Sequence, residues 1–212
     1  MLIPFKELFN KHNIRPIGCL HIGANAGQEA EQYVENGLKI VVWVEALPDV
    51  YVKLCSKVGG ISGHFAFNAC VSDEDGKQVR FNIANNEGQS SSLLEFGTHS
   101  REHPSVKFTE TVEMTTTRTD TLLRQHKIIV GEGWMLNIDV QGAELLVLRG
   151  MGDLLHRFAC IYIEVNEREL YKGCPLVHEI DQYLAHHGFV GKDCKMMRQG
   201  WGDKFYMKES EA

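Results

Sequence analysis

LHIGANAGQEA, residues 20–30, predicts the end of a strand, a tight turn and the start of a helix. The run 17–22 has the apolar character of a buried strand, and the small residues Gly23–Gly27 follow it. Glycine allows a sharp turn and lets the backbone approach a ligand closely, and the first turn of a helix offers free N–H groups. This order is typical of pockets for nucleotide-like ligands, and an ordinary tight turn shares the same pattern.

Segments of the same kinds follow along the chain. Buried strands are predicted over 38–45, 64–71, 134–140 and 160–165, and helices over 28–36, 49–58, 143–150 and 177–187, with a further helix starting at 119. Additional β-strands are expected over 78–83, 107–117, 190–197 and 204–208. Strands that alternate with helices predict an α/β fold around a mostly parallel sheet.

The length of 212 residues suits a single domain over residues 1–212. Residues 1–16 are expected to form a helical cover at one edge, because Phe5, Leu8 and Phe9 have helical spacing. The polar segment 85–104 lacks periodicity and is interpreted either as a lid or acceptor-binding loop or as an ordinary surface loop. Its serines, His99 and His103 could hydrogen-bond a hydroxyl of an acceptor.

Composition narrows the class of protein. The chain is 43% hydrophobic and 24% charged with a net charge of −6, which argues against nucleic acid as its main partner. No apolar run approaches the roughly twenty residues of a membrane span, and the start of the chain does not resemble a signal peptide. We therefore expect a cytoplasmic protein, with its six scattered cysteines reduced.

The residues at the carboxyl ends of the predicted strands are the candidates for ligand binding, because ligands of open parallel sheets lie beyond those ends. Glu45 ends the second strand, where a carboxylate can accept hydrogen bonds from both hydroxyls of a ribose; the alternative is a solvated acid that caps a helix. The loop 23–27 has two glycines, not the three of the usual pyrophosphate cradle. A nucleoside ligand without phosphates, such as S-adenosylmethionine, therefore suits it better than NAD.

Two motifs carry a resemblance to a known family. VEALP at 44–48, following HIGANAGQE at 21–29, and LNIDVQGAELLVLRGM at 136–151 resemble the FkbM family of S-adenosylmethionine-dependent methyltransferases, over about residues 17–169. The resemblance implies a class I methyltransferase fold, Rossmann-like, with a seven-stranded sheet, one antiparallel strand and helices on both faces. It also implies O-methylation of a hydroxyl on a sugar or related metabolite.

The resemblance also assigns roles to residues. It places the cofactor loop at Gly23, Ala24, Asn25 and Gly27, the ribose-binding acid and its neighbour at Glu45 and Ala46, the adenine contacts at Cys70 and Val71, and the methionine end of the cofactor beside Asp139. His21 departs from the family, in which many members carry an acid two residues before the first glycine. It could bind the cofactor or a substrate group, or only pack.

An alcohol is a weak nucleophile until it loses its proton, so a base or a metal ion assists its methylation. The candidate bases are Asp139, Glu144 and Glu164. Glu144 could instead stabilise the start of a helix, and Glu164 could pair with Arg149 or Arg168. Asp139, Glu164 and Asn166 would also suit Mg²⁺, although no residue is assigned as a metal ligand. The partner is then a small-molecule or glycan acceptor, and the alternatives are an NAD-linked oxidoreductase and a non-catalytic cofactor-binding module.

Overall fold

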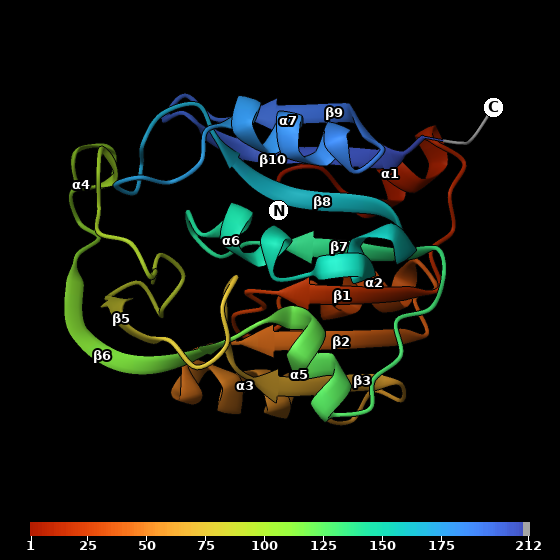
Figure 1. Ribbon diagram of the computed structural model, residues 1–212, viewed down its shortest axis with the longest axis horizontal. Coiled ribbons are helices and arrows are strands. Elements are labelled where there is room, and N and C mark those ends of the chain that lie inside the picture. Colours follow the sequence, from red (N-terminus) through yellow and green to blue (C-terminus); the bar gives the residue numbers. More distant parts are fainter. Residues whose placement is uncertain (210–212) are drawn as a thin grey trace.

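The computed structural model describes residues 1–209, and a seven-stranded sheet lies at its centre (Figure 1). The strands, in spatial order, are β3 (His64–Asn68), β2 (Ile40–Glu45), β1 (Gly18–Ile22), β7 (Trp134–Ile138), β8 (Phe158–Asn166), β10 (Trp201–Lys208) and β9 (Phe189–Met196). Strand β10 pairs antiparallel with both of its neighbours, and the other pairs are parallel. The expected seven-stranded sheet with one antiparallel strand is therefore confirmed.

Helices cover both faces of this sheet, because successive residues of its strands point apolar side chains to opposite sides. One face is covered by α1 (Phe5–Lys11), α2 (Ala30–Glu35) and α3 (Pro48–Val58), which share a core with Cys19 and Trp43. The other face is covered by α5 (Thr119–Gln125), α6 (Glu144–Arg149), the 3₁₀ segment η1 (Gly152–Arg157) and α7 (Val177–His186), which share a core with Leu20 and Ile22.

A smaller sheet stands at the carboxyl ends of the parallel strands. It has the order β4 (Cys70–Val71), β6 (Phe108–Thr117) and β5 (Gln78–Ala84), and the short helix α4 (His99–Glu102) lies near it. Figure 1 shows β5, β6 and α4 at the left, the direction in which the arrowheads of β1 and β2 point. The segment between β5 and β6 is thereby placed beside the end of the main sheet where ligands of such folds bind.

The structure corrects several predicted boundaries. The strand expected over 64–71 is two strands in different sheets: β3 ends at Asn68, whose side-chain amide donates to the carbonyl oxygens of Glu45 and Ala46, and Cys70 pairs with Thr116 of β6. The strand expected over 134–140 ends at Ile138. Trp201, expected in the turn before the last strand, begins β10, and the helices α4 and η1 were not predicted.

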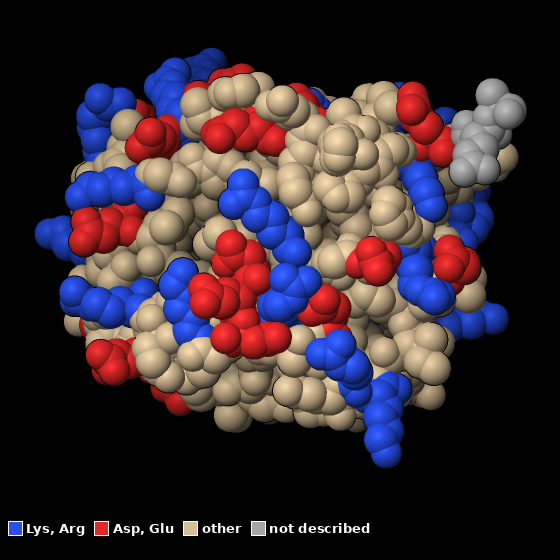
Figure 2. Space-filling model, in the orientation of Figure 1, with Lys and Arg blue, Asp and Glu red and all other residues tan. Residues whose placement is uncertain are grey.

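Within residues 1–209, no helix has both the length and the apolar character that crossing a membrane requires. All six cysteines are free thiols, and four of them are buried. Figure 2 shows Lys and Arg side chains interspersed with Asp and Glu on the visible face of the molecule.

Candidate active site

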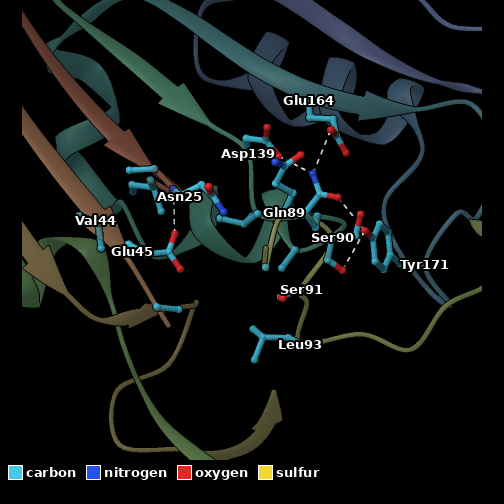
Figure 3. A pocket seen from close by; sticks show the side chains of 18 of the residues that line it. Asn25, Val44, Glu45, Gln89, Ser90, Ser91, Leu93, Asp139, Glu164 and Tyr171 are labelled. Carbon is cyan, nitrogen blue, oxygen red and sulfur yellow. Dashed lines mark hydrogen bonds between the residues drawn. The ribbon is translucent and has the colours of Figure 1, made fainter. Parts of the chain in front are cut away.

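A cavity of about 530 Å³ lies at the carboxyl ends of β1, β2, β7 and β8. Its walls come from the β1–α2 loop, the end of β2, residues 69–71, the turn after β7, and the segment 86–106 that precedes β6. Figure 3 shows Asn25 and Glu45 on one side of this cavity, and Asp139, Glu164 and Tyr171 on the other. The cavity therefore gathers residues from most of the predicted strand ends.

The glycine turn after β1 is fixed by contacts that only glycine permits. Gly23 has a φ of +81°, and a Cβ atom there would lie 1.8 Å from the carbonyl oxygen of Asp139. The amides of Gly23 and Ala24 both donate to the carbonyl oxygen of Val44, at 2.9 and 3.0 Å. Gly27 does not line the cavity; a Cβ there would lie 2.9 Å from Leu54 Cδ1, so this glycine lets the loop pack on α3.

Glu45 joins the glycine turn to the end of β2. Its Oε2 accepts the backbone N–H of Asn25 and its Oε1 accepts that of Leu47, both at 2.9 Å. The carboxylate is buried, and this burial raises its pKa. Each oxygen retains a lone pair, so a ligand in the cavity can donate to it. Ala46, Cys70 and Val71 also line the cavity.

Gln141 connects the two acids on the opposite side of the cavity. Its Nε2 donates to Asp139 Oδ1 at 2.6 Å and to Glu164 Oε2 at 3.1 Å, and its Oε1 accepts the hydroxyl of Tyr171 at 2.6 Å. Its φ of +55° is rare for a residue other than glycine and indicates a constrained position. Sequence reasoning missed Gln141 and Tyr171, although Gln141 lies within the DVQGAE motif.

Burial and mutual repulsion change the acidity of this pair. Burial raises the pKa of Asp139 to about 6, and burial together with the negative charge of Asp139 raises the pKa of Glu164 well above its ordinary value. Two neighbouring carboxylates in a cavity resist ionising together, so the pair loses its second proton at a higher pH than its first. Glu164, for which Arg149 or Arg168 was the expected partner, is hydrogen-bonded to Gln141 instead.

The charged side chains of the cavity lining are all acidic. The amino group of Met1, which also lines the cavity, offsets part of the rise in the pKa of Asp139 that burial causes. Among residues 1–209, its lining contains no Lys or Arg side chain. It contains five acidic side chains, those of Glu29, Glu45, Asp139, Glu164 and Asp203. A cation without phosphate groups therefore suits this cavity, and an anion does not.

Glu144 does not line the cavity. Its buried Oε1 accepts the backbone N–H groups of Gly142 at 2.9 Å and Val140 at 3.3 Å, so its carboxylate stabilises the turn after β7. Asn166 is fully buried and also lies outside the lining, so the oxygen set predicted for Mg²⁺ does not face the cavity together. Within the described chain, no group of three or more His, Cys, Asp or Glu side chains could hold a metal ion.

His21 lies at the floor of the cavity and is held by its neighbours. Its Nδ1 is 3.1 Å from the hydroxyl of Tyr33, its Nε2 is 3.3 Å from Nδ2 of Asn137, and its ring packs against Trp43. The side chain is buried, and this burial lowers its pKa to about 3. A neutral, hydrogen-bonded ring in this place supports the strand ends on which the cavity is built.

Comparison with known proteins agrees with this geometry. Residues 21–190 match the family model described as the methyltransferase FkbM domain. The chain is 27% identical over 162 residues to the 2-O-methyltransferase NoeI of Sinorhizobium fredii, a match that covers 73% of this chain but less than two thirds (65%) of that protein.

Solved structures resemble the fold at low sequence identity. Fibrillarin of Aeropyrum pernix, in complex with S-adenosyl-L-methionine, superposes with a TM-score of 0.51 at 13% identity, covering 92% of this chain and 67% of that one. Fibrillarin of Methanococcus jannaschii gives 0.53 at 13% identity, covering 100% and 71%. These likenesses show the class I fold alone. With the family match over most of its length, the chain belongs to the FkbM methyltransferase domain family.

Proposed function

We propose that the chain is an S-adenosylmethionine-dependent methyltransferase that methylates a hydroxyl of a sugar or a related polyhydroxylated metabolite. The observation that carries the proposal is the carboxylate pair of half-buried Asp139 and buried Glu164, which are joined by Gln141 and line the same cavity as Glu45. Methyl transfer to a hydroxyl needs a base, and this pair provides one beside the residues proposed to bind the cofactor. The name of the similar protein NoeI, a 2-O-methyltransferase, supports transfer to oxygen.

The cofactor half of the cavity is formed by the glycine turn and the end of β2. Glu45, already held by two backbone amides, directs its remaining lone pairs to the ribose hydroxyls. Gly23, Ala24 and Asn25 would hold the cofactor along the glycine turn. Cys70 and Val71 would flank its adenine. S-adenosylmethionine is a phosphate-free ligand with a positively charged sulfonium, so it fits a lining rich in carboxylates; when bound, it supplies an electrophilic methyl group.

The acid pair acts on the proton of the acceptor. Asp139, with a pKa of about 6, is largely ionised at neutral pH and accepts the hydroxyl proton, whereas burial and the charge of Asp139 raise the pKa of Glu164 well above its ordinary value. Gln141 holds both carboxylates in place, which limits the reorganisation that transfer requires. Glu144, engaged by two backbone amides, has no part in this scheme.

The acceptor enters from the side of segment 85–104, which we propose to be the acceptor-binding loop. Residues 86–93, His99 and His103 from this segment line the cavity in part. The net charge of −6 and the mixed surface charges in Figure 2 favour a small molecule or glycan over nucleic acid.

The proposal is tested by incubating the purified chain with S-adenosylmethionine and matched pairs of acceptors, and by measuring S-adenosylhomocysteine. Each pair consists of a methyl glycoside and the analogue in which an amino group replaces one hydroxyl. We expect O-methylated glycosides, with kcat reduced about 10²- to 10⁴-fold in Asp139→Asn and cofactor affinity retained. Methyl transfer to nitrogen alone would overturn O-methylation. Cofactor binding without transfer to any acceptor would support a non-catalytic module.

A further inference from the structure

The acceptor loop is fixed to the chain that follows β8. The amides of Gly97 and His99 donate to the carbonyl oxygen of Leu170, at 2.7 and 3.1 Å, and the amide of Thr98 donates to that of Glu169 at 2.9 Å. Gly97 has no room for a side chain, since a Cβ would lie 2.2 Å from the carbonyl oxygen of Glu169. His99 is therefore held in one place at the wall of the cavity, before any ligand binds.

One face of the His99 ring packs against a neighbouring ring, and one of its nitrogens has no hydrogen-bond partner in the described part of the chain. It stacks on Phe96 with 4.2 Å between ring centroids and an angle of 6°, and it lies 5.4 Å from the ring of Tyr171. The residue is 5% exposed and lines the cavity. Its Nδ1 has no hydrogen-bond partner among the described residues. A buried polar atom without a partner is costly, so a ligand hydroxyl that displaces the packing over Nδ1 and hydrogen-bonds to it offsets this cost.

The ring is also neutral. Burial, with repulsion from His103, lowers the pKa of His99 to about 4. A neutral imidazole has one donor and one acceptor nitrogen, which matches a hydroxyl group. The side chains of the lining offer no positive charge to an anion, because this cavity holds five carboxylates and, within residues 1–209, no Lys or Arg. A phosphate or carboxylate placed here would be repelled and left without a partner.

We propose, on the basis of the proposed function, that the acceptor is an uncharged glycoside whose ring packs against the partly exposed Trp201, and that His99 binds one of its hydroxyls. Tyr171 and Trp201 line the same cavity and belong to one apolar cluster. Aromatic faces beside a few fixed polar groups are the usual composition of a site for a neutral ligand. His99 thus selects the acceptor, whereas Asp139 receives its proton.

The test measures binding rather than turnover. Saturation-transfer NMR on the chain saturated with S-adenosylhomocysteine compares a panel of methyl hexopyranosides with their 6-phosphates and uronates. We expect the neutral glycosides to bind and the anionic ones to bind at least about ten-fold more weakly. His99→Phe, which keeps the stacking on Phe96, should weaken neutral glycosides about ten-fold, and His99→Gln should restore part of that loss.

The control is His126→Phe, since the exposed His126 ring contacts the ring of Phe67, with 4.4 Å between centroids, and lies outside the cavity lining. It should leave glycoside binding unchanged. Equal or tighter binding of anionic glycosides, no binding of any neutral glycoside, or unchanged affinity in His99→Phe would each overturn the inference while leaving cofactor binding intact. Failure of S-adenosylhomocysteine itself to bind would overturn the proposed function and the inference with it.

Discussion

Replacing Glu45 by glutamine should weaken the binding of S-adenosylmethionine without removing the side chain. In the structure, the two carboxylate oxygens accept the amides of Asn25 and Leu47, and both face the cavity side on which we place the ribose. The amide that replaces one oxygen can only donate, so one hydroxyl of the ribose loses a charged acceptor. Hydrogen bonds to charged groups contribute about 1.5–3 kcal/mol, so Kd should rise about 10- to 150-fold.

The matched control is Glu144→Gln. Glu144 is also a buried carboxylate that accepts two backbone N–H groups, but it does not line the cavity. Glu45→Gln should lose roughly 1–3 kcal/mol of unfolding free energy, because the amide nitrogen replaces one of the two oxygens that accept backbone N–H groups. Glu144→Gln should lose less, because both of its N–H partners donate to Oε1, which the glutamine oxygen can replace. Isothermal titration with the cofactor separates them: only Glu45→Gln should change Kd. Equal Kd values for wild type and Glu45→Gln, with both folded, would refute the ribose-binding role.

Three further changes probe the support of the site. His21 has a pKa of about 3 in the folded chain, whereas an ordinary histidine has a pKa of about 6.5. Between these values the unfolded chain binds a proton that the folded chain does not, so the His21 contribution to stability is complete above pH 6.5 and falls as the pH falls. By pH 5, chemical denaturation of wild type should show a loss of unfolding free energy ~2 kcal/mol larger than that of His21→Gln. The Cβ of Gly23→Ala would collide with a carbonyl oxygen, so this variant should lose cofactor binding. It should also lower the melting temperature far more than Gly37→Ala, because Gly37 has the same φ of +81° but no neighbour near its Cβ position, and the backbone strain there costs about 1–2 kcal/mol. Equal melting temperatures would contradict the close packing at Gly23. Tyr171→Phe, which removes the donor to Gln141, should lower kcat about five- to ten-fold with an unchanged KM for cofactor; steady-state kinetics in which only KM moves would argue against an orienting role.

The sequence predicted the elements whose signals are local. The apolar run before Gly23 and the small residues after it specify a strand and a tight turn without reference to any other part of the chain. Glu45 could be identified for the same reason, because it stands at the end of an apolar strand. The resemblance carried by LNIDVQGAELLVLRGM supplied the fold family, which the match over residues 21–190 confirms.

The rest depends on contacts between distant segments. The break of the strand expected over 64–71 follows from the side chain of Asn68, which binds carbonyl groups at the end of β2. Glu144 stood beside Asp139 in the same motif, and only the folded turn shows that its carboxylate points to backbone amides. His99 lies on a loop without periodicity, and its position is set by hydrogen bonds to residues about seventy positions further along the chain.

Methyl transfer to a hydroxyl of an uncharged acceptor is tested most directly by mass spectrometry. The chain is incubated with S-adenosylmethionine that carries a trideuterated methyl group, and with neutral glycosides or a cell extract. We expect wild type to form a product with one labelled methyl ether on an uncharged ring. Asp139→Asn should form far less of this product at saturating cofactor. A label found on nitrogen, or on an anionic acceptor, or full product from Asp139→Asn would contradict this expectation.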